Sequence, residues 1–213
     1  MSKGLSYIND AKAAIAESKN KISGNIKIFC LCNRGTVTRA IERFTSIYPE
    51  VNFILDCDYI IREGYDILIN TESEFEYVSK TLLFDEDILI AMHKRNPLAD
   101  KKDLCIKDLK NERFITGLRA PTVDACEEAG FTPNITFQVN DSQYVRKYVE
   151  LGLGIAFTPA YSWRGTFSEN VVLRNVGIKR KTYAYLPANK RIKKSVEYFL
   201  DILIEESSDA RQS

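Results

Sequence analysis

The sequence has few of the residues from which metal and cofactor sites are built. Its 213 residues include five cysteines, two methionines, one tryptophan and a single histidine. A structural zinc site takes about four cysteine or histidine ligands. The chain offers His93 and one close cysteine pair, Cys30 and Cys32. We therefore expect no metal ion and no cofactor.

The signatures of several common enzyme classes are also missing. The chain contains no G-x-S-x-G nucleophile elbow, no phosphate-binding loop and no glycine signature of a dinucleotide-binding fold. The only histidine, His93, has no partner in the sequence that suggests acid–base work. We expect that the protein is not an enzyme.

Long apolar runs and an excess of one charge are absent as well. No segment approaches the about 18 consecutive apolar residues of a membrane span, and the charged first 21 residues do not resemble a signal peptide. Lysine and arginine number 30 against 29 acidic residues, so the formal net charge is +1 and a strongly basic nucleic-acid surface is not indicated. We interpret the odd number of cysteines as reduced thiols of a cytoplasmic protein; they are Cys30, Cys32, Cys57, Cys105 and Cys126.

Short apolar runs alternate along the chain with segments of helical periodicity, and 45% of the residues are hydrophobic. The pattern predicts strands at Ile26–Phe29, Val51–Leu55, Asp66–Ile69, Ile88–Met92, Arg113–Thr116, Ile135–Val139, Ile155–Thr158, Val171–Arg174 and Thr182–Leu186. It predicts helices at Leu5–Ile22, Thr36–Tyr48, Pro121–Ala129, Asp141–Leu151 and Ile192–Leu203, with Thr36 and Asp141 as N-caps. This alternation indicates an α/β architecture with largely parallel sheets.

Five segments, taken in order, resemble the effector-binding domains of LysR-type transcription regulators. The first, IKIFC…AIERFTSIYPEV, resembles their opening strand and helix, which typically closes with F-x-x-x-Y-P. The others are EGYDILI, DEDILIAMHKRNPLADKKDLCIKDLKNERFI, DACEEAGFTPNITFQVND and VELGLGIAFTP. Each segment alone is a weak signal, but together they cover the chain from Gly24 to about Ile204.

The resemblance implies a two-lobed α/β fold like that of type 2 periplasmic binding proteins, each lobe being a sheet flanked by helices. Lobe I would comprise residues 24–92 and 187–206, lobe II residues 93–186, and the tail residues 207–213. Residues 1–23 would then be a remnant of the linker helix. The winged helix-turn-helix domain that precedes it in the family would be missing.

Two segments depart from the family pattern. The loop CLCNRG is shorter than usual and lacks the common Ser/Thr run. The stretch Leu55–Gly64 is too short for the usual second helix of the first lobe, which often contributes to side-by-side pairing. We expect a homodimer or homotetramer, with the dimer geometry left open.

The effector site is expected in two loops that follow strands and precede helices. Ligands of α/β folds bind beyond the carboxyl ends of strands, where helix N-termini favour anions. The expected site residues are Cys32, Asn33, Arg34, Thr36, Thr116, Gly117, Arg119 and Thr158. An arginine guanidinium can donate two parallel hydrogen bonds to one carboxylate. The alternative is that Thr36 is only a cap and that both arginines are ordinary surface charges.

Four other residues are more simply interpreted as structural. Asp66 opens a strand in a Gly-x-Asp pattern, Cys126 falls inside ACEEAGF, His93 lies beside an expected crossing between the lobes, and Asp141 caps a helix. Peroxide sensing would need an activated thiolate and a resolving partner. Cys32 lies close to Arg34, but the second lobe offers no matching cysteine pair.

The function implied is that of a regulatory domain. A small anionic metabolite, such as a carboxylate, would bind between the lobes and change their relative angle by shifting a conformational equilibrium. DNA would be contacted only through the missing N-terminal domain, and no membrane is involved. The alternative is a stand-alone solute-binding protein of the same fold, which would need an export signal or a lipid anchor.

Overall fold

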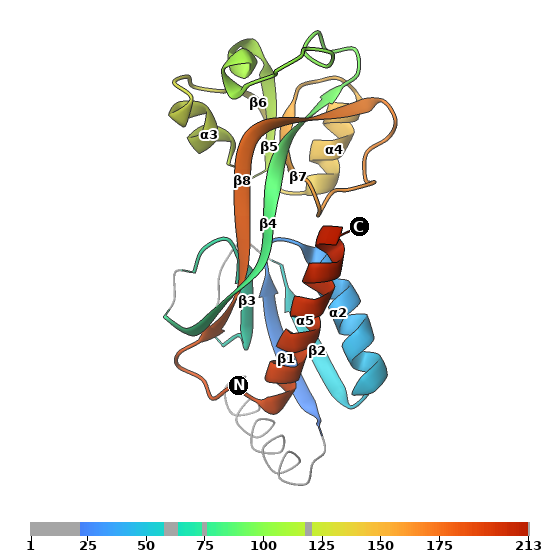
Figure 1. The fold of residues 1–213 in the computed structure, drawn as a ribbon, viewed down its shortest axis with the longest axis vertical. Helices are drawn as coiled ribbons and strands as arrows, with labels where there is room; N and C mark the ends of the chain where they lie inside the picture. Colours follow the sequence, from blue (N-terminus) through green and yellow to red (C-terminus); the bar gives the residue numbers. More distant parts are fainter. Residues whose placement is uncertain (1–21, 58–63, 74–75, 118–120, 213) are drawn as a thin grey trace. The chain divides into compact units, whose positions relative to one another are not determined.

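The computed structural model describes residues 22–57, 64–73, 76–117 and 121–212 (Figure 1). The expected linker helix, most of the shortened segment 55–64 and Arg119 lie outside these residues. The strands are β1 (Gly24–Cys30), β2 (Val51–Asp56), β3 (Ile67–Asn70), β4 (Tyr77–His93), β5 (Arg113–Gly117), β6 (Asn134–Val139), β7 (Ala156–Pro159) and β8 (Val171–Pro187). The helices are α2 (Arg34–Ile47), η1 (Ile106–Asn111, a 3₁₀ helix), α3 (Thr122–Glu128), α4 (Ser142–Glu150) and α5 (Lys194–Gln212).

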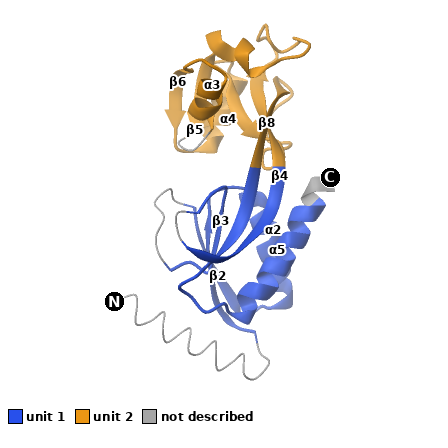
Figure 2. Ribbon diagram, turned by 60° about the vertical axis from the view of Figure 1, so that its left-hand side comes forward, with its two compact units in different colours: residues 1–85, 181–213 blue, residues 86–180 orange. Residues whose placement is uncertain are grey.

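The chain divides into two compact units (Figure 2). Unit 1 takes the residues up to Asp85 and from Lys181, and unit 2 takes Glu86–Arg180. The strand order β2-β1-β3-β8-β4-β7 shows that β4 and β8 are neighbours, and both strands run through the division. The lobe boundaries expected from the sequence, 92/93 and 186/187, lie further along these same strands. A continuous strand carries no break in its apolar pattern, so the pattern does not mark the division.

Unit 1 is built on three parallel strands covered on one face by two helices. β1 lies between β2 and β3 and pairs in parallel with both. Helices α2 and α5 lie side by side in Figure 1. Their rings meet over β2: Phe44 lies 5.6 Å from both Phe53 and Phe199, measured between ring centroids. This aromatic contact fixes α2, and with it the loop that joins β1 to α2.

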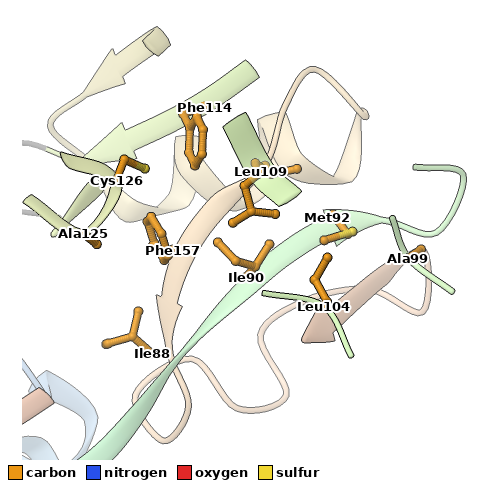
Figure 3. Close-up of a cluster of buried hydrophobic side chains, with 11 residues drawn as sticks. Ile88, Ile90, Met92, Ala99, Leu104, Leu109, Phe114, Ala125, Cys126 and Phe157 are labelled. Atoms are coloured by element: carbon orange, nitrogen blue, oxygen red, sulfur yellow. The ribbon is translucent and has the colours of Figure 1, made fainter. Parts of the chain in front are cut away.

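Unit 2 has its own apolar core, drawn in Figure 3. It is formed by Ile88, Ile90, Met92, Ala99, Leu104, Leu109, Phe114, Ala125, Cys126, Ile155 and Phe157. Cys126 is fully buried, which confirms its interpretation as a packed residue, and burial raises the pKa of its thiol to about 11. The core holds β4, β5 and β7 together with α3.

Two expectations about the elements were wrong, and the strand expected at Ile88–Met92 is the last part of the longer β4. Helix α2 begins at Arg34 rather than after Thr36, because Asn33 adopts the left-handed conformation (φ 56°, ψ 36°), which asparagine tolerates. The carbonyl of Asn33 accepts hydrogen bonds from the N–H groups of Thr36 and Val37. The strands expected at 171–174 and 182–186 are one strand, β8, because the polar residues between them also pair with β4. The cap at Asp141 is confirmed: its carboxylate accepts the N–H of Gln143 at 2.8 Å.

A ladder of three ion pairs joins β4 to β8 where both strands pass from one unit to the other. The pairs are Lys181–Asp85 at 4.0 Å, Arg180–Glu86 at 2.6 Å and Lys179–Asp87 at 3.3 Å. The carboxylate of Glu86 is 0% exposed, and its second oxygen accepts the N–H of Tyr161 at 3.0 Å. The acidic partner of the central pair is therefore buried and has two hydrogen-bond donors, whereas the Arg180 side chain is 21% exposed.

Asp66 braces unit 1, which confirms its structural interpretation. Its carboxylate accepts the backbone N–H of Lys27 on β1 at 2.8 Å. The same carboxylate pairs with Lys190 at 3.1 Å and Lys193 at 3.4 Å, just before α5. One buried acidic side chain thus ties β1 to the start of the last helix.

Candidate ligand-binding site

The first group of expected site residues lies in the loop between β1 and α2. Arg34, the first residue of the helix, donates from its guanidinium to the carbonyl of Cys57 at the end of β2, at 3.0 Å. The thiol of Cys32 lies 3.9 Å from the carbonyl of Ile69 in β3. Because β1, β2 and β3 are parallel, the loop lies over the carboxyl ends of all three strands. This is the edge at which α/β folds bind ligands.

The remaining members of this group face inward. Asn33 is buried, and so is Thr36, whose hydroxyl accepts a hydrogen bond from the guanidinium of Arg39 at 3.2 Å. The first turn of α2 therefore offers Arg34 as its exposed side chain, with the buried Asn33 and Thr36 shaping the backbone beneath it.

Cys30, the last residue of β1, stays in its protonated thiol form. Burial raises the pKa of the Cys30 thiol far above its ordinary value, and the nearby thiols Cys32 and Cys57 raise it further. Its sulfur donates to the carbonyl of Cys32 at 3.1 Å. A thiol with so high a pKa is a poor nucleophile at neutral pH, because the thiolate is the reactive form.

One residue that the sequence did not single out lies close to this loop. Tyr185 on β8 donates its hydroxyl to the carbonyl of Thr71, just after β3, at 3.1 Å. Burial raises the pKa of Tyr185 to about 12, with smaller contributions from Tyr77, Tyr183, Glu72 and Cys32. The alternation Tyr-Ala-Tyr is a sign that both tyrosines share one face of the strand, but nothing in the sequence indicates that Cys32 is their neighbour.

The second group lies in unit 2, at the carboxyl ends of β5 and β7. The backbone N–H of Ile155 donates to the carbonyl of Arg113, and the carbonyl of Ile155 accepts the N–H of Ile115, both at 2.8 Å. Ile155, just before β7, therefore pairs in parallel with β5. Thr116, Gly117 and Thr158 therefore lie toward the same edge of the unit.

The hydroxyl groups at this second edge differ in their partners. The hydroxyl of Thr116 lies 2.9 Å from that of Thr122, at the start of α3, and donates to the carbonyl of Gly117 at 3.1 Å. Thr158 is 1% exposed, and its hydroxyl makes no hydrogen bond with any residue that the structure describes. A buried hydroxyl of this kind normally has a partner.

Each loop thus supplies hydrogen-bonding groups at a carboxyl edge of its own unit. In the described part of the chain, no three or more His, Cys, Asp or Glu side chains are grouped so as to hold a metal ion. Over the same residues, no helix combines the length and the apolar character needed to cross a membrane. The groups that these loops offer are backbone, hydroxyl and guanidinium groups.

Comparison with known families shows to which family the chain belongs. The family described as "LysR substrate binding domain" matches residues 19–208. The chain belongs to this family. It is similar to the "Transcriptional dual regulator GltC" of Bacillus subtilis (strain 168), at 25% identity over 98% of this chain and 76% of GltC.

The fold matches those of solved LysR effector-binding domains. The effector-binding domain of QuiR in complex with shikimate matches with a TM-score of 0.73 and 19% identity, over 88% of this chain and 98% of that chain. The effector-binding domain of BenM with its effector benzoate matches with a TM-score of 0.73 and 17% identity, over 89% of this chain and 94% of that chain. These matches confirm the expected two-lobed α/β fold class.

Proposed function

We propose that this chain is the effector-sensing regulatory domain of a LysR-type transcription regulator and that it binds a small carboxylate between its two units. The observation that carries the proposal is that both loops named from the sequence lie over the carboxyl ends of strands in their own units. Family membership supports the regulatory role, and shikimate and benzoate in the QuiR and BenM structures support the ligand class.

The proposed contacts divide between the units. Unit 1 contributes Cys32, Asn33, Arg34 and Thr36, and unit 2 contributes Thr116, Gly117, Arg119 and Thr158. Guanidinium groups bind carboxylates through paired hydrogen bonds. Arg34 has five N–H donors and uses one of them on the Cys57 carbonyl, so the other four can serve a ligand. The Thr158 hydroxyl is a further group for a bound molecule to satisfy.

Ligand binding acts on the regulator through its conformational equilibrium. An effector changes the angle between the units only as far as it binds one arrangement more tightly than the other. In the complete cytoplasmic regulator, a homodimer or homotetramer, that change would alter how N-terminal DNA-binding domains are held. The chain itself would contact DNA only through such a domain.

The test is a binding measurement with defined carboxylates. Thermal unfolding of the chain is recorded with sodium benzoate, shikimate and a panel of common metabolic acids. A ligand at 100 times its dissociation constant adds about 2.7 kcal/mol of stability. For any acid that binds, Arg34→Ala and Arg119→Ala should each weaken binding about tenfold or more, because a charge-assisted hydrogen bond contributes about 1.5–3 kcal/mol.

The matched control is Arg191→Ala, which removes an exposed arginine of unit 1 that has no part in either loop. It should leave the affinity unchanged. Equal affinities for the wild-type chain and both loop variants would show that the ligand binds elsewhere.

A further inference from the structure

Unit 2 contains a pocket at the end of β5 opposite to the proposed effector residues. Its volume is about 450 Å³, and its lining includes His93, Arg95, Asn96, Glu112, Arg113 and Gly152. Arg113 begins β5, whereas Thr116 and Gly117 end it. Thr116 is three residue steps along the strand from Arg113, a distance of about 10 Å at roughly 3.3 Å per residue. The pocket is within the usual range for small-molecule sites, about 300–1,000 Å³.

Two glycines allow the chain after α4 to form one wall of this pocket. Gly152 has φ +72°, and a Cβ placed on it would lie 3.7 Å from the His93 side chain. A Cβ on Gly154 would lie only 2.5 Å from the carbonyl oxygen of Arg113. The segment LGLG therefore packs directly against β5 and His93. A larger residue at Gly154 would collide with β5, whereas Gly152 is needed for its positive φ.

His93 presents a hydrogen-bond donor to the pocket. The side chain is 8% exposed, and its Nδ1 accepts the backbone N–H of Arg95 at 3.0 Å. In the neutral ring the proton is then on Nε2. Across the described ranges of the chain, no residue accepts a hydrogen bond from this nitrogen. A ligand oxygen would serve as an acceptor for this N–H.

The charges around the pocket favour an anion. Arg95 and Arg113 are both exposed, and neither forms an ion pair with the residues that the structure describes. Glu112 is the acidic residue of the lining, and its Oε2 accepts the side-chain N–H of Asn96 at 2.8 Å. Two arginines against one carboxylate give the lining a formal charge of +1 with neutral histidine. The paired N–H groups of a guanidinium match the oxygen geometry of carboxylate and phosphate.

We infer that this pocket is a second binding site, which takes the oxyanion group of a small metabolite, a carboxylate or a phosphate, between Arg95, Arg113 and the Nε2–H of His93. It lies apart from the proposed effector residues of unit 2 and does not depend on them. The domain would then bind small molecules at two sites, one at each end of β5.

The single histidine of the chain makes the test direct, because the imidazole signals in an NMR spectrum all come from His93. The chain is titrated with sodium phosphate and, separately, with sodium succinate, at ionic strength held constant with NaCl. We expect a saturable shift of the imidazole signals. Saturation by phosphate alone or succinate alone identifies the group that the site prefers.

Variants separate binding from a general effect of charge. Arg95→Gln and Arg113→Gln should each lower the affinity for the anion that saturates the site, about tenfold or more. The control is Lys94→Gln, which removes the same charge beside His93 from an exposed residue outside the lining; it should change the affinity less than twofold. Circular dichroism checks that each variant is folded.

Two results would overturn the inference. One is a shift that grows linearly with both anions and never saturates. The other is a loss of affinity in Lys94→Gln as large as in the arginine variants. Because the readout is the His93 ring, neither result bears on whether an effector binds at Arg34 or Arg119.

Discussion

The ion pair between Arg180 and Glu86 gives the sharpest prediction about stability. The Glu86 carboxylate is 0% exposed and is held by the Arg180 guanidinium at 2.6 Å and the Tyr161 N–H at 3.0 Å. Arg180→Ala leaves a buried carboxylate with one neutral donor. Removing one partner of a buried pair costs about 3–5 kcal/mol of unfolding free energy. We expect Arg180→Ala to fall in this range.

The neighbouring pairs of the same ladder are matched controls. Lys179 is 68% exposed and Lys181 is 56% exposed, and their acidic partners are also accessible. Exposed pairs contribute about 0–1 kcal/mol, so Lys179→Ala and Lys181→Ala should each cost no more than this. Replacing both central residues, Glu86→Met with Arg180→Met, should cost less than Arg180→Ala, because no buried charge is left unpaired.

The assay is urea unfolding followed by the fluorescence of Trp163, the single tryptophan. Trp163 belongs to unit 2, as do Glu86 and Arg180, and its ring contacts Phe167 and the Arg146 guanidinium. Its emission therefore reports the unit that the mutation affects. An Arg180→Ala variant that loses no more stability than Lys181→Ala would refute the claim that the buried Glu86 carboxylate needs Arg180 for the stability of the fold.

Two further predictions concern the backbone of unit 2. Asp141→Ala should lower the unfolding free energy by about 1 kcal/mol through loss of the α4 cap, while Asp141→Asn, which also caps, should lose much less; urea unfolding measures both, and equal losses would contradict the capping role. Gly154→Ala should cost about 1–3 kcal/mol, because its Cβ would meet the Arg113 carbonyl. Gly35→Ala, which meets nothing within 4 Å, is its control in a thermal unfolding comparison, and a Gly154→Ala variant as stable as Gly35→Ala would count against the close approach.

The sequence predicted elements well where local chemistry decides them. Asp141 follows a strand and precedes an amphipathic run, and a carboxylate there has one favourable role, which is to cap the helix. Cys126 lies in the helix α3, where the small hydrophobic character of a thiol favours burial, and it is fully buried. At the start of α2 the cap predicted from residue type is wrong. Thr36 is a good cap by type, but the left-handed Asn33 starts the helix first.

Features that join distant segments could not be predicted in the same way. Glu86 and Arg180 are 94 positions apart, and a run of acidic or basic residues is normally taken as a solvated face. The residues between Arg174 and Thr182 therefore favour a loop when seen alone. They form a strand because β4 supplies both hydrogen bonds and opposite charges. The pocket at His93 was missed because its walls come from three separate segments.

The ladder also limits how the proposed effector response can work. β4 and β8 pass between the units at Asp85–Glu86 and Arg180–Lys181. The free energy that couples an effector to a conformational change is typically about 1–3 kcal/mol, less than the roughly 3–5 kcal/mol needed to strip a partner from a buried ion pair. In the proposed response, an effector of ordinary coupling strength would therefore leave Glu86 paired with Arg180. The two strands would keep their register at this pair, and the proposed change of angle would come from bending beside it, where the exposed pairs of Lys179 and Lys181 can break and re-form at little cost.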